Sequence, residues 1–463
     1  MTAVVEETVP EAAGGGGGKA PGRPGPDPAA ALRTSLPVAN FLSFFAIAAV
    51  EFAVPFVAVS TLGASSLVVG ALGICRFAPQ VLLARTAALL VERYDQRSVM
   101  LGSELLRVLA FLLSALALAA GPAWGTVVFC LANVALACGS VLTSVSTQVL
   151  VPAVFPDREL PRIYARLGMA ESGADGLAPF VTGVGLGLLG VPWTFATAAA
   201  LALCACALLV RIPRVRVPAG PEAPGKGEET TRSTQSTQNT ESTESTESTE
   251  STESTEKRSP GRTTLRHGLR LNLATPALRI LTFWALAYNF GQCVIEALLL
   301  IVLLDQTPLT AVGFGVIRSC VVLFAVAGSG LAERLPARLR TGLGTSVFGC
   351  GAVASYALVG FGAYLGGTAG LVLVLAGFVL DEFCSGVVAV RVQTFRARAI
   401  AQEDRAIATA SYRAANLTAV PVGFALGGLA GLFLSPVHTL VTVGALMLLP
   451  AVLVLSRSVR ETG

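Results

Sequence analysis

The stretch GALGICRFAPQVLL, residues 70–83, is almost entirely apolar or small, yet Arg76 stands in its middle. A guanidinium at the centre of a membrane helix costs about 2.5 kcal/mol or more, so it needs a reason to be there. The spacing Gly73-x-x-Arg76 recurs as Gly315-x-x-Arg318, and the second arginine follows the first by 242 residues. The charge is therefore a repeated feature of the chain, which indicates two homologous halves.

The composition places these halves in a membrane. The chain of 463 residues is 53% hydrophobic and 13% charged, whereas soluble domains carry about 25% charged residues. About 20 apolar residues cross the hydrocarbon core as a helix. We therefore predict an all-α membrane protein of twelve transmembrane helices in two pseudo-symmetric six-helix bundles. The predicted spans are 36–60, 66–89, 98–120, 123–148, 165–190, 191–210, 277–304, 311–331, 341–364, 369–391, 405–433 and 437–456.

Lysine and arginine are confined to alternate connections. The connections after spans 2, 4, 6, 8 and 10 all carry them, as in ERYDQR and ERLPARLR. The intervening connections, such as STLGASS and DQTPLT, have none. Because basic residues stay on the cytoplasmic side, both termini are expected in the cytoplasm of a multi-pass protein of the cell membrane.

The domain organisation follows from the same patterns. We expect a disordered cytoplasmic tail (1–34), an N-terminal bundle (35–211), a cytoplasmic linker (212–275), a C-terminal bundle (276–456) and a short cytoplasmic tail (457–463). Residues 233–256 are eight triplets that end in five STE repeats. Such a composition cannot bury enough apolar surface to fold, which favours a flexible tether over a docking segment.

The connection after span 2 carries a motif. ALLVERYDQR resembles the loop signature of the major facilitator superfamily, with Glu92, Arg93 and Arg97 at the charged positions. A second copy, GSGLAERLPARL, carries Glu333 and Arg334. The resemblance implies two bundles that alternate around a central cavity, with these loops latching them on the cytoplasmic side.

Three further stretches resemble the drug, macrolide and siderophore exporters of that superfamily. These are SELLRVLAF, LVPAVFPDRELPRIYA and GLAPFVTGVG, the last of which contains Pro179 and Gly183. Pro421 follows Pro179 by the same 242 residues and opens PVGFALGGLAG in span 11. We interpret the three residues as a helix-packing motif, and the resemblance implies export.

Eleven ionisable residues lie near mid-depth in the predicted spans. Intramembrane charges face the protein interior or water, so we expect these to serve the cavity or to pair with one another. The predicted proton and substrate residues are Glu51, Glu171, Asp175, Glu296 and Asp381. The predicted counter-charges are Arg76, Glu104, Arg107, Arg318 and Arg413; Glu382 is the eleventh residue.

Spacing suggests roles for some of them. Glu104 and Arg107 share one helical face and are expected to form an ion pair there or with a neighbouring helix. Glu171 and Asp175 form one stripe of span 5, where either they take up protons or an arginine neutralises them. Adjacent Asp381 and Glu382 point about 100° apart, so they are not expected to face the cavity together.

Glu51 and Glu296 occupy the first span of each half and have no basic partner within one turn of their own helix. The family resemblance implies that these two spans line the cavity. The partner of Arg76 is expected on span 1, 3 or 5, with a fixed structural role favoured over a movable one. Tyr288, Asn289 and Gln292, a turn or two from Glu296, are either ligand contacts or helix–helix contacts.

These features predict a secondary active transporter that exports a small molecule, such as an antibiotic, siderophore or other amphipathic compound, by proton antiport. The nucleotide-binding pattern GxxxxGK[ST] is absent, which excludes ATP as the drive from this chain. Sodium coupling, proton-symport uptake of a nutrient and a non-transporting scaffold or sensor remain alternatives. No enzyme activity, cofactor, metal or nucleic-acid partner is expected, and the chain is expected to be monomeric in the bilayer.

Overall fold

The computed structural model describes residues 28–156, 158–210, 265–307, 309–332, 334–335, 342–402 and 404–460. The regular structure of these residues is helical. The first half contains α1 (Pro28–Ser60), α2 (Ser66–Leu82), α3 (Ala84–Arg93), α4 (Gln96–Leu116), a 3-10 turn η1 (Ala117–Ala120), α5 (Gly121–Val154), α6 (Leu160–Leu188) and α7 (Val191–Val210). The second half contains α8 (Leu265–Asn272), α9 (Pro276–Gln306), α10 (Ala311–Ala332), α11 (Gly342–Leu365), α12 (Gly367–Ala399), α13 (Arg405–Phe433), α14 (Pro436–Leu446), α15 (Leu448–Val454) and α16 (Arg457–Arg460).

The predicted twelve-helix membrane fold is confirmed. Ten helical segments of the described chain are long and apolar enough to cross a bilayer, and the stretch 66–82 of α2 is a shorter apolar helix. The remaining span is α6, whose 29 residues reach about 43 Å at 1.5 Å per residue, which exceeds a hydrocarbon core of about 30 Å.

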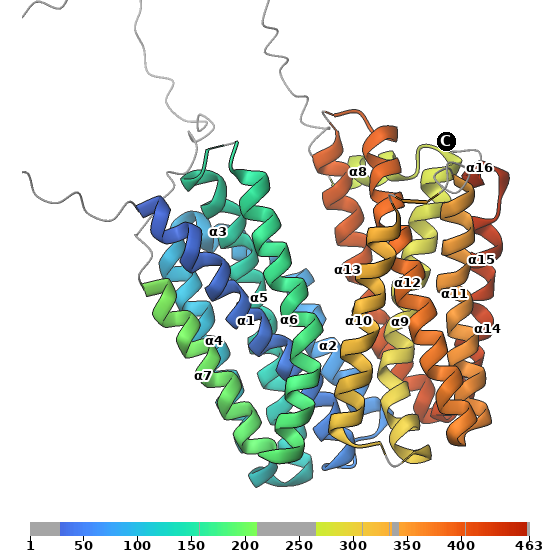
Figure 1. Ribbon diagram of the computed structural model, residues 1–463, viewed down its shortest axis with the longest axis horizontal. Coiled ribbons are helices and arrows are strands. Elements are labelled where there is room, and N and C mark those ends of the chain that lie inside the picture. Colours follow the sequence, from blue (N-terminus) through green and yellow to red (C-terminus); the bar gives the residue numbers. More distant parts are fainter. Residues whose placement is uncertain are drawn as a thin grey trace, which may run out of the picture.

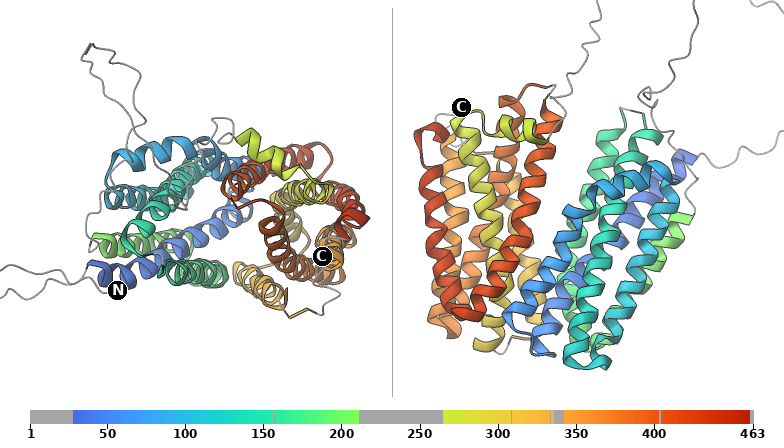
Figure 2. Two further views of the ribbon diagram at one scale, coloured as in Figure 1. Left: turned by 90° about the horizontal axis from the view of Figure 1, so that it is seen from above. Right: turned by 180° about the vertical axis from the view of Figure 1, so that it is seen from behind.

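The twelve spans form two bundles that stand side by side (Figure 1). One bundle is built from α1–α7 and the other from α9–α15, and each buries its own apolar core. The start of α1, the end of α7, helix α8 and the C-terminal helix α16 all lie at one end of the molecule, which we call the termini side (Figure 1). The opposite end is the distal side. The bundles stand apart at the termini side and converge at the distal side (Figure 2).

Glycine residues make the convergence possible. The second span of each bundle crosses the fifth span of the other, so α2 packs on α13 and α10 packs on α6. At the first crossing, a Cβ on Gly70 would lie 2.6 Å from the carbonyl oxygen of Phe424. At the second, a Cβ on Gly183 would lie 2.5 Å from that of Ala311. Only residues without a side chain let the two backbones approach this closely, a device that membrane helices use widely.

Two predicted spans are each divided into two helices. The span expected over 66–89 bends at Leu83, although its amide still donates to the Pro79 carbonyl at 2.9 Å. The span expected over 437–456 is interrupted at Met447. Pro450 has no amide hydrogen to give to the carbonyl of Leu446, so the helical ladder cannot run through this point.

Part of the expected linker is helical. The STE repeats lie outside the described residues, but residues 265–272 form α8 on the termini side. Asn272 holds α8 in place, because its side-chain amide donates to the carbonyl oxygens of Gly268 and Ala408, each at 2.8 Å. Its oxygen accepts from Arg396, whose guanidinium stacks over the Tyr412 ring at 3.4 Å. The last part of the expected linker therefore packs on the second bundle as α8, ahead of its first span α9.

Candidate functional site

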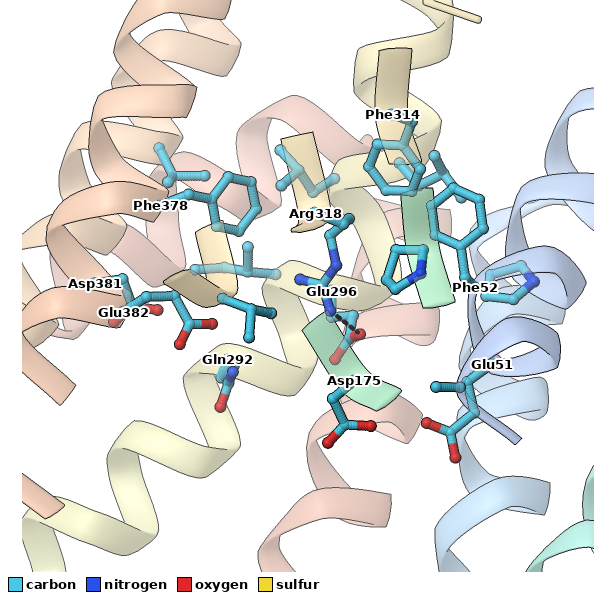
Figure 3. A pocket seen from close by; sticks show the side chains of 18 of the residues that line it. Glu51, Phe52, Asp175, Gln292, Glu296, Phe314, Arg318, Phe378, Asp381 and Glu382 are labelled. Carbon is cyan, nitrogen blue, oxygen red and sulfur yellow. Dashed lines mark ion pairs between the residues drawn. The ribbon is translucent and has the colours of Figure 1, made fainter. Parts of the chain in front are cut away.

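A cavity of about 340 Å³ lies between the two bundles (Figure 3). Helices α1 and α6 form its wall in the first bundle, and α9–α12 form its wall in the second. A smaller cavity of about 90 Å³, between α1, α2, α5, α9 and α13, adjoins it and shares Glu51 and Glu296 with it. Among the ionisable residues that line the larger cavity are five carboxylic acids and one arginine: Glu51, Asp175, Glu296, Asp381, Glu382 and Arg318.

Glu51 of α1 forms an ion pair with Arg76 of α2. The side chain of Arg76 is 11% exposed and that of Glu51 is 38% exposed, so the pair reaches from the protein interior to the cavity wall. The guanidinium also lies 5.7 Å from the centre of the Phe77 ring. The partner of Arg76 is thus on span 1, one of the three helices that the sequence left open.

Glu296 of α9 and Arg318 of α10 form the corresponding pair in the second bundle, at 3.8 Å. Their side chains are 53% and 38% exposed, which makes this pair more open than the first (Figure 3). In both bundles, therefore, a glutamate on the first helix faces an arginine on the second. The repeat seen in the sequence brings an acid and a base together twice.

Glu171 and Asp175 lie in different surroundings although they share a stripe of α6. The Asn40 side chain of α1 donates to Glu171 at 3.4 Å, and Glu171 is not among the residues that line either cavity. Asp175 is exposed and lines the larger cavity, where its carboxylate and that of Glu51 point toward each other (Figure 3). Within the described residues, neither acid has an arginine within 4.0 Å.

The expectation that Asp381 and Glu382 do not both face the cavity is wrong, because both line it. Asp381 is 4% exposed and accepts a hydrogen bond of 3.0 Å from the Tyr288 hydroxyl. Glu382 is half-buried beside Gln292 (Figure 3). A cavity wall that curves around α12 can include side chains that point about 100° apart.

Glu104 and Arg107 form an intrahelical ion pair deep inside the first bundle, where each side chain is 2% exposed. Ser43 of α1 completes the cluster: its hydroxyl donates to Glu104 at 2.7 Å and accepts from Arg107 at 2.6 Å. Neither charged residue lines the cavities. The pair therefore joins α1 to α4.

Other predicted site residues lie away from the cavities. Arg413 is exposed on α13, about two turns after the helix begins, and lines neither cavity. Arg93 is exposed at the end of α3, Arg334 is exposed just after α10, and Arg97 is half-buried in the first turn of α4. Glu333 and the side chain of Glu92 lie outside the described part of the chain.

The predicted packing residues have different surroundings. The Pro179 carbonyl contacts the backbone at Gly315, and Gly183 forms the α6 side of that crossing. Pro421 lies within α13, whose neighbours include α2 and α9.

The aromatic part of the cavity was not predicted from the sequence. Phe52 of α1 stacks on Phe314 of α10, with ring centres 5.2 Å apart, and so joins the two bundles inside the cavity wall. Phe378 and Tyr356 line the second-bundle side. Phenylalanines in an apolar span look like lipid-facing or core residues. The one available signal was position, since Phe52 follows Glu51 and Phe314 precedes Gly315.

Comparison with known proteins agrees with this architecture. The family model described as Major Facilitator Superfamily matches residues 37–378. The chain belongs to the major facilitator superfamily. Membership of this superfamily identifies a membrane transporter of small molecules rather than an enzyme. No curated protein matches the chain in sequence.

Solved structures of other superfamily transporters share the fold. A bacterial homologue of the iron transporter ferroportin, in an inward-facing state, is 15% identical, with a TM-score of 0.64 over 92% of this chain and 99% of that one. The nucleoside transporter NupG is 12% identical, with a TM-score of 0.65 over 91% and 97%. A POT family transporter in complex with a thioalcohol-conjugated peptide is 12% identical, with a TM-score of 0.63 over 91% and 95%. At these identities the likeness establishes the fold alone.

Proposed function

We propose that this chain is a secondary active transporter that exports a small amphipathic molecule in exchange for protons. The observation that carries the proposal is a set of three carboxylic acids on the cavity wall: Asp175, Asp381 and Glu382. None of them has an arginine within 4.0 Å among the described residues, whereas Glu51 and Glu296 do. An acid in a membrane cavity without a fixed counter-ion is the kind of group that can load and release a proton.

The arrangement of the bundles supports alternating access. The helix crossings at Gly70 and Gly183 hold the distal side together, while the bundles stand apart at the termini side (Figure 1). Placing the termini in the cytoplasm, as the basic connections indicate, makes this the inward-facing state. To export its substrate, the transporter must then separate these crossings and close the termini side.

The direction of transport rests on the resemblance of span 5 to exporters, together with Pro179 and Gly183 at the α6–α10 crossing. Accumulation assays in an efflux-deficient bacterial host test it. Cells that express the full chain are loaded with a panel of dyes and antibiotics, with and without a protonophore. We expect the chain to lower the accumulation of at least one compound and the protonophore to abolish that effect.

Two variants sharpen the assay. Asp175→Asn combined with Glu382→Gln removes two of the unpaired carboxylates and should abolish efflux. Asp305→Asn changes an exposed acid near the distal end of α9 that does not line the cavities, and it should leave efflux unchanged. Efflux that survives the protonophore, or increased uptake of a nutrient by the expressing cells, would contradict the proposal.

A further inference from the structure

We infer that the central cavity selects organic cations with an aromatic or bulky apolar body. This inference rests on the proposed transport function and names the substrate class of the same site. Two observations support it: one bears on the charge of the ligand and the other on its apolar body. The first is the charge that remains on the cavity wall after its ion pairs are counted, and the second is the placement of the aromatic rings.

When its unpaired carboxylic acids are ionised, the wall is negative on both sides. The pairs Glu51–Arg76 and Glu296–Arg318 are neutral, which leaves Asp175 on the first bundle and Asp381 and Glu382 on the second. A carboxylate attracts a cation and repels an anion, and the interaction is stronger in a partly buried cavity than in bulk water because the effective dielectric constant is lower. An anion would therefore be repelled from both walls, whereas a cation is attracted to both.

The aromatic rings determine what surrounds that charge. Phe52 and Phe314 lie on one side of the cavity, and Phe378 lies across from them on the same side as Glu382 (Figure 3). Asp175 lies below the rings in this view, between the two sides (Figure 3). The face of an aromatic ring attracts a cation, and it also packs well against a flat apolar body. A small hydrated cation uses none of this surface, so the lining favours a large organic one.

The same carboxylic acids explain how substrate binding would be coupled to proton binding. A carboxylic acid that holds a proton is neutral and offers no charge to a cation. Proton and substrate therefore compete for Asp175 and Glu382, and binding of the cation should weaken as the solution becomes more acidic. This competition requires no gradient, so it can be measured on the purified protein in detergent.

Tetraphenylphosphonium and tetraphenylborate provide a matched pair of probes, because they have nearly the same shape and opposite charge. We would measure their binding to the full-length protein by isothermal titration calorimetry, with empty micelles as the blank and ethidium as a second, flat cation. Tetraphenylphosphonium or ethidium should bind, and tetraphenylborate should bind at least tenfold more weakly. Millimolar Mn²⁺ should not displace the organic cation.

The variants assign binding to the cavity. Asp175→Asn with Glu382→Gln should weaken cation binding at least tenfold, whereas Asp305→Asn should not change it. A melting curve for each variant verifies that it is folded. Failure of both cations to bind, equal binding of tetraphenylborate, or unchanged binding in the double variant would overturn the inference. If a neutral or anionic compound is nevertheless exported, the proposed function stands and only the substrate class is wrong.

Discussion

Glu51 of α1 and Arg76 of α2 form an ion pair that reaches from the interior of the first bundle to the wall of the central cavity. The first two helices of the second bundle repeat the arrangement with Glu296 and Arg318. The arginine that looked isolated in the sequence thus has a partner on the preceding helix. The two ion pairs differ in burial, and this difference determines how much stability each variant should lose.

Glu51→Gln should abolish transport while the protein still inserts into the membrane. It should also destabilise the fold by about 1.5–3 kcal/mol, because the 11%-exposed Arg76 loses its charged partner. Thermal unfolding in detergent measures the loss. The double variant Glu51→Gln/Arg76→Gln removes both charges and should recover most of the stability without recovering transport. Near-normal transport by the single variant would remove Glu51 from the mechanism.

Glu296→Gln should change stability much less, by under about 1 kcal/mol. Its pair with Arg318 is longer, at 3.8 Å, and both side chains are more than a third exposed. Transport should nevertheless fall, since Glu296 lines both cavities. Parallel melting curves and efflux rates for Glu51→Gln and Glu296→Gln test this contrast. An equal loss of stability in the two variants would show that the pairs are energetically equivalent.

Glu104→Gln should act on folding rather than on coupling. It leaves Arg107 without its carboxylate in a site where each side chain is 2% exposed, and breaking a buried pair costs about 3–5 kcal/mol. The amount of folded protein in the membrane should drop sharply. Efflux per folded molecule should keep its sensitivity to the protonophore, as measured by normalising transport to the monodisperse fraction. Normal yield with uncoupled transport would instead place Glu104 in the proton pathway.

A fourth prediction concerns the α6–α10 crossing on the distal side. A Cβ at Gly315 would meet the backbone of Pro179 and Gly183 on α6, so Gly315→Ala must push the two bundles apart. We expect a loss of about 1–3 kcal/mol, as for overpacking, and slower transport. Gly330→Ala is the matched control on the same helix, because nothing lies within 4 Å of its Cβ. It should be neutral or slightly stabilising, as judged by melting temperature. Equal effects would show that the crossing has no special role.

The sequence predicted the fold well because periodic apolar runs and basic connections are local signals. Apolar length identified the spans, and the recurrence of Gly73-x-x-Arg76 identified the two halves. Helix interruptions were harder to predict, because they depend on individual residues. Pro450 divides the last span, although hydropathy averaged over about 20 residues conceals it.

The candidate site was less predictable, because partners are chosen by packing between helices. The i, i+4 spacing put Glu171 and Asp175 on one stripe of α6. In the structure Asn40 of α1 donates a hydrogen bond to Glu171, whereas Asp175 lines the cavity. Likewise, the offset of 242 residues linked Arg76 to Arg318 without showing that each faces a glutamate on the preceding helix. Contacts between helices are not visible in the periodicity of any one helix.

The most direct test of the central claim is proton movement driven by substrate in a purified system. The full-length protein is reconstituted into proteoliposomes that contain a pH-sensitive dye and have an acidic lumen. Ethidium is then added outside, or the compound that the host panel shows to be exported most strongly. Proton antiport predicts that the compound accumulates inside while the lumen becomes less acidic. Both changes should vanish with the Asp175→Asn/Glu382→Gln variant. Accumulation without any change in lumenal pH, or accumulation that follows a sodium gradient instead, would contradict it.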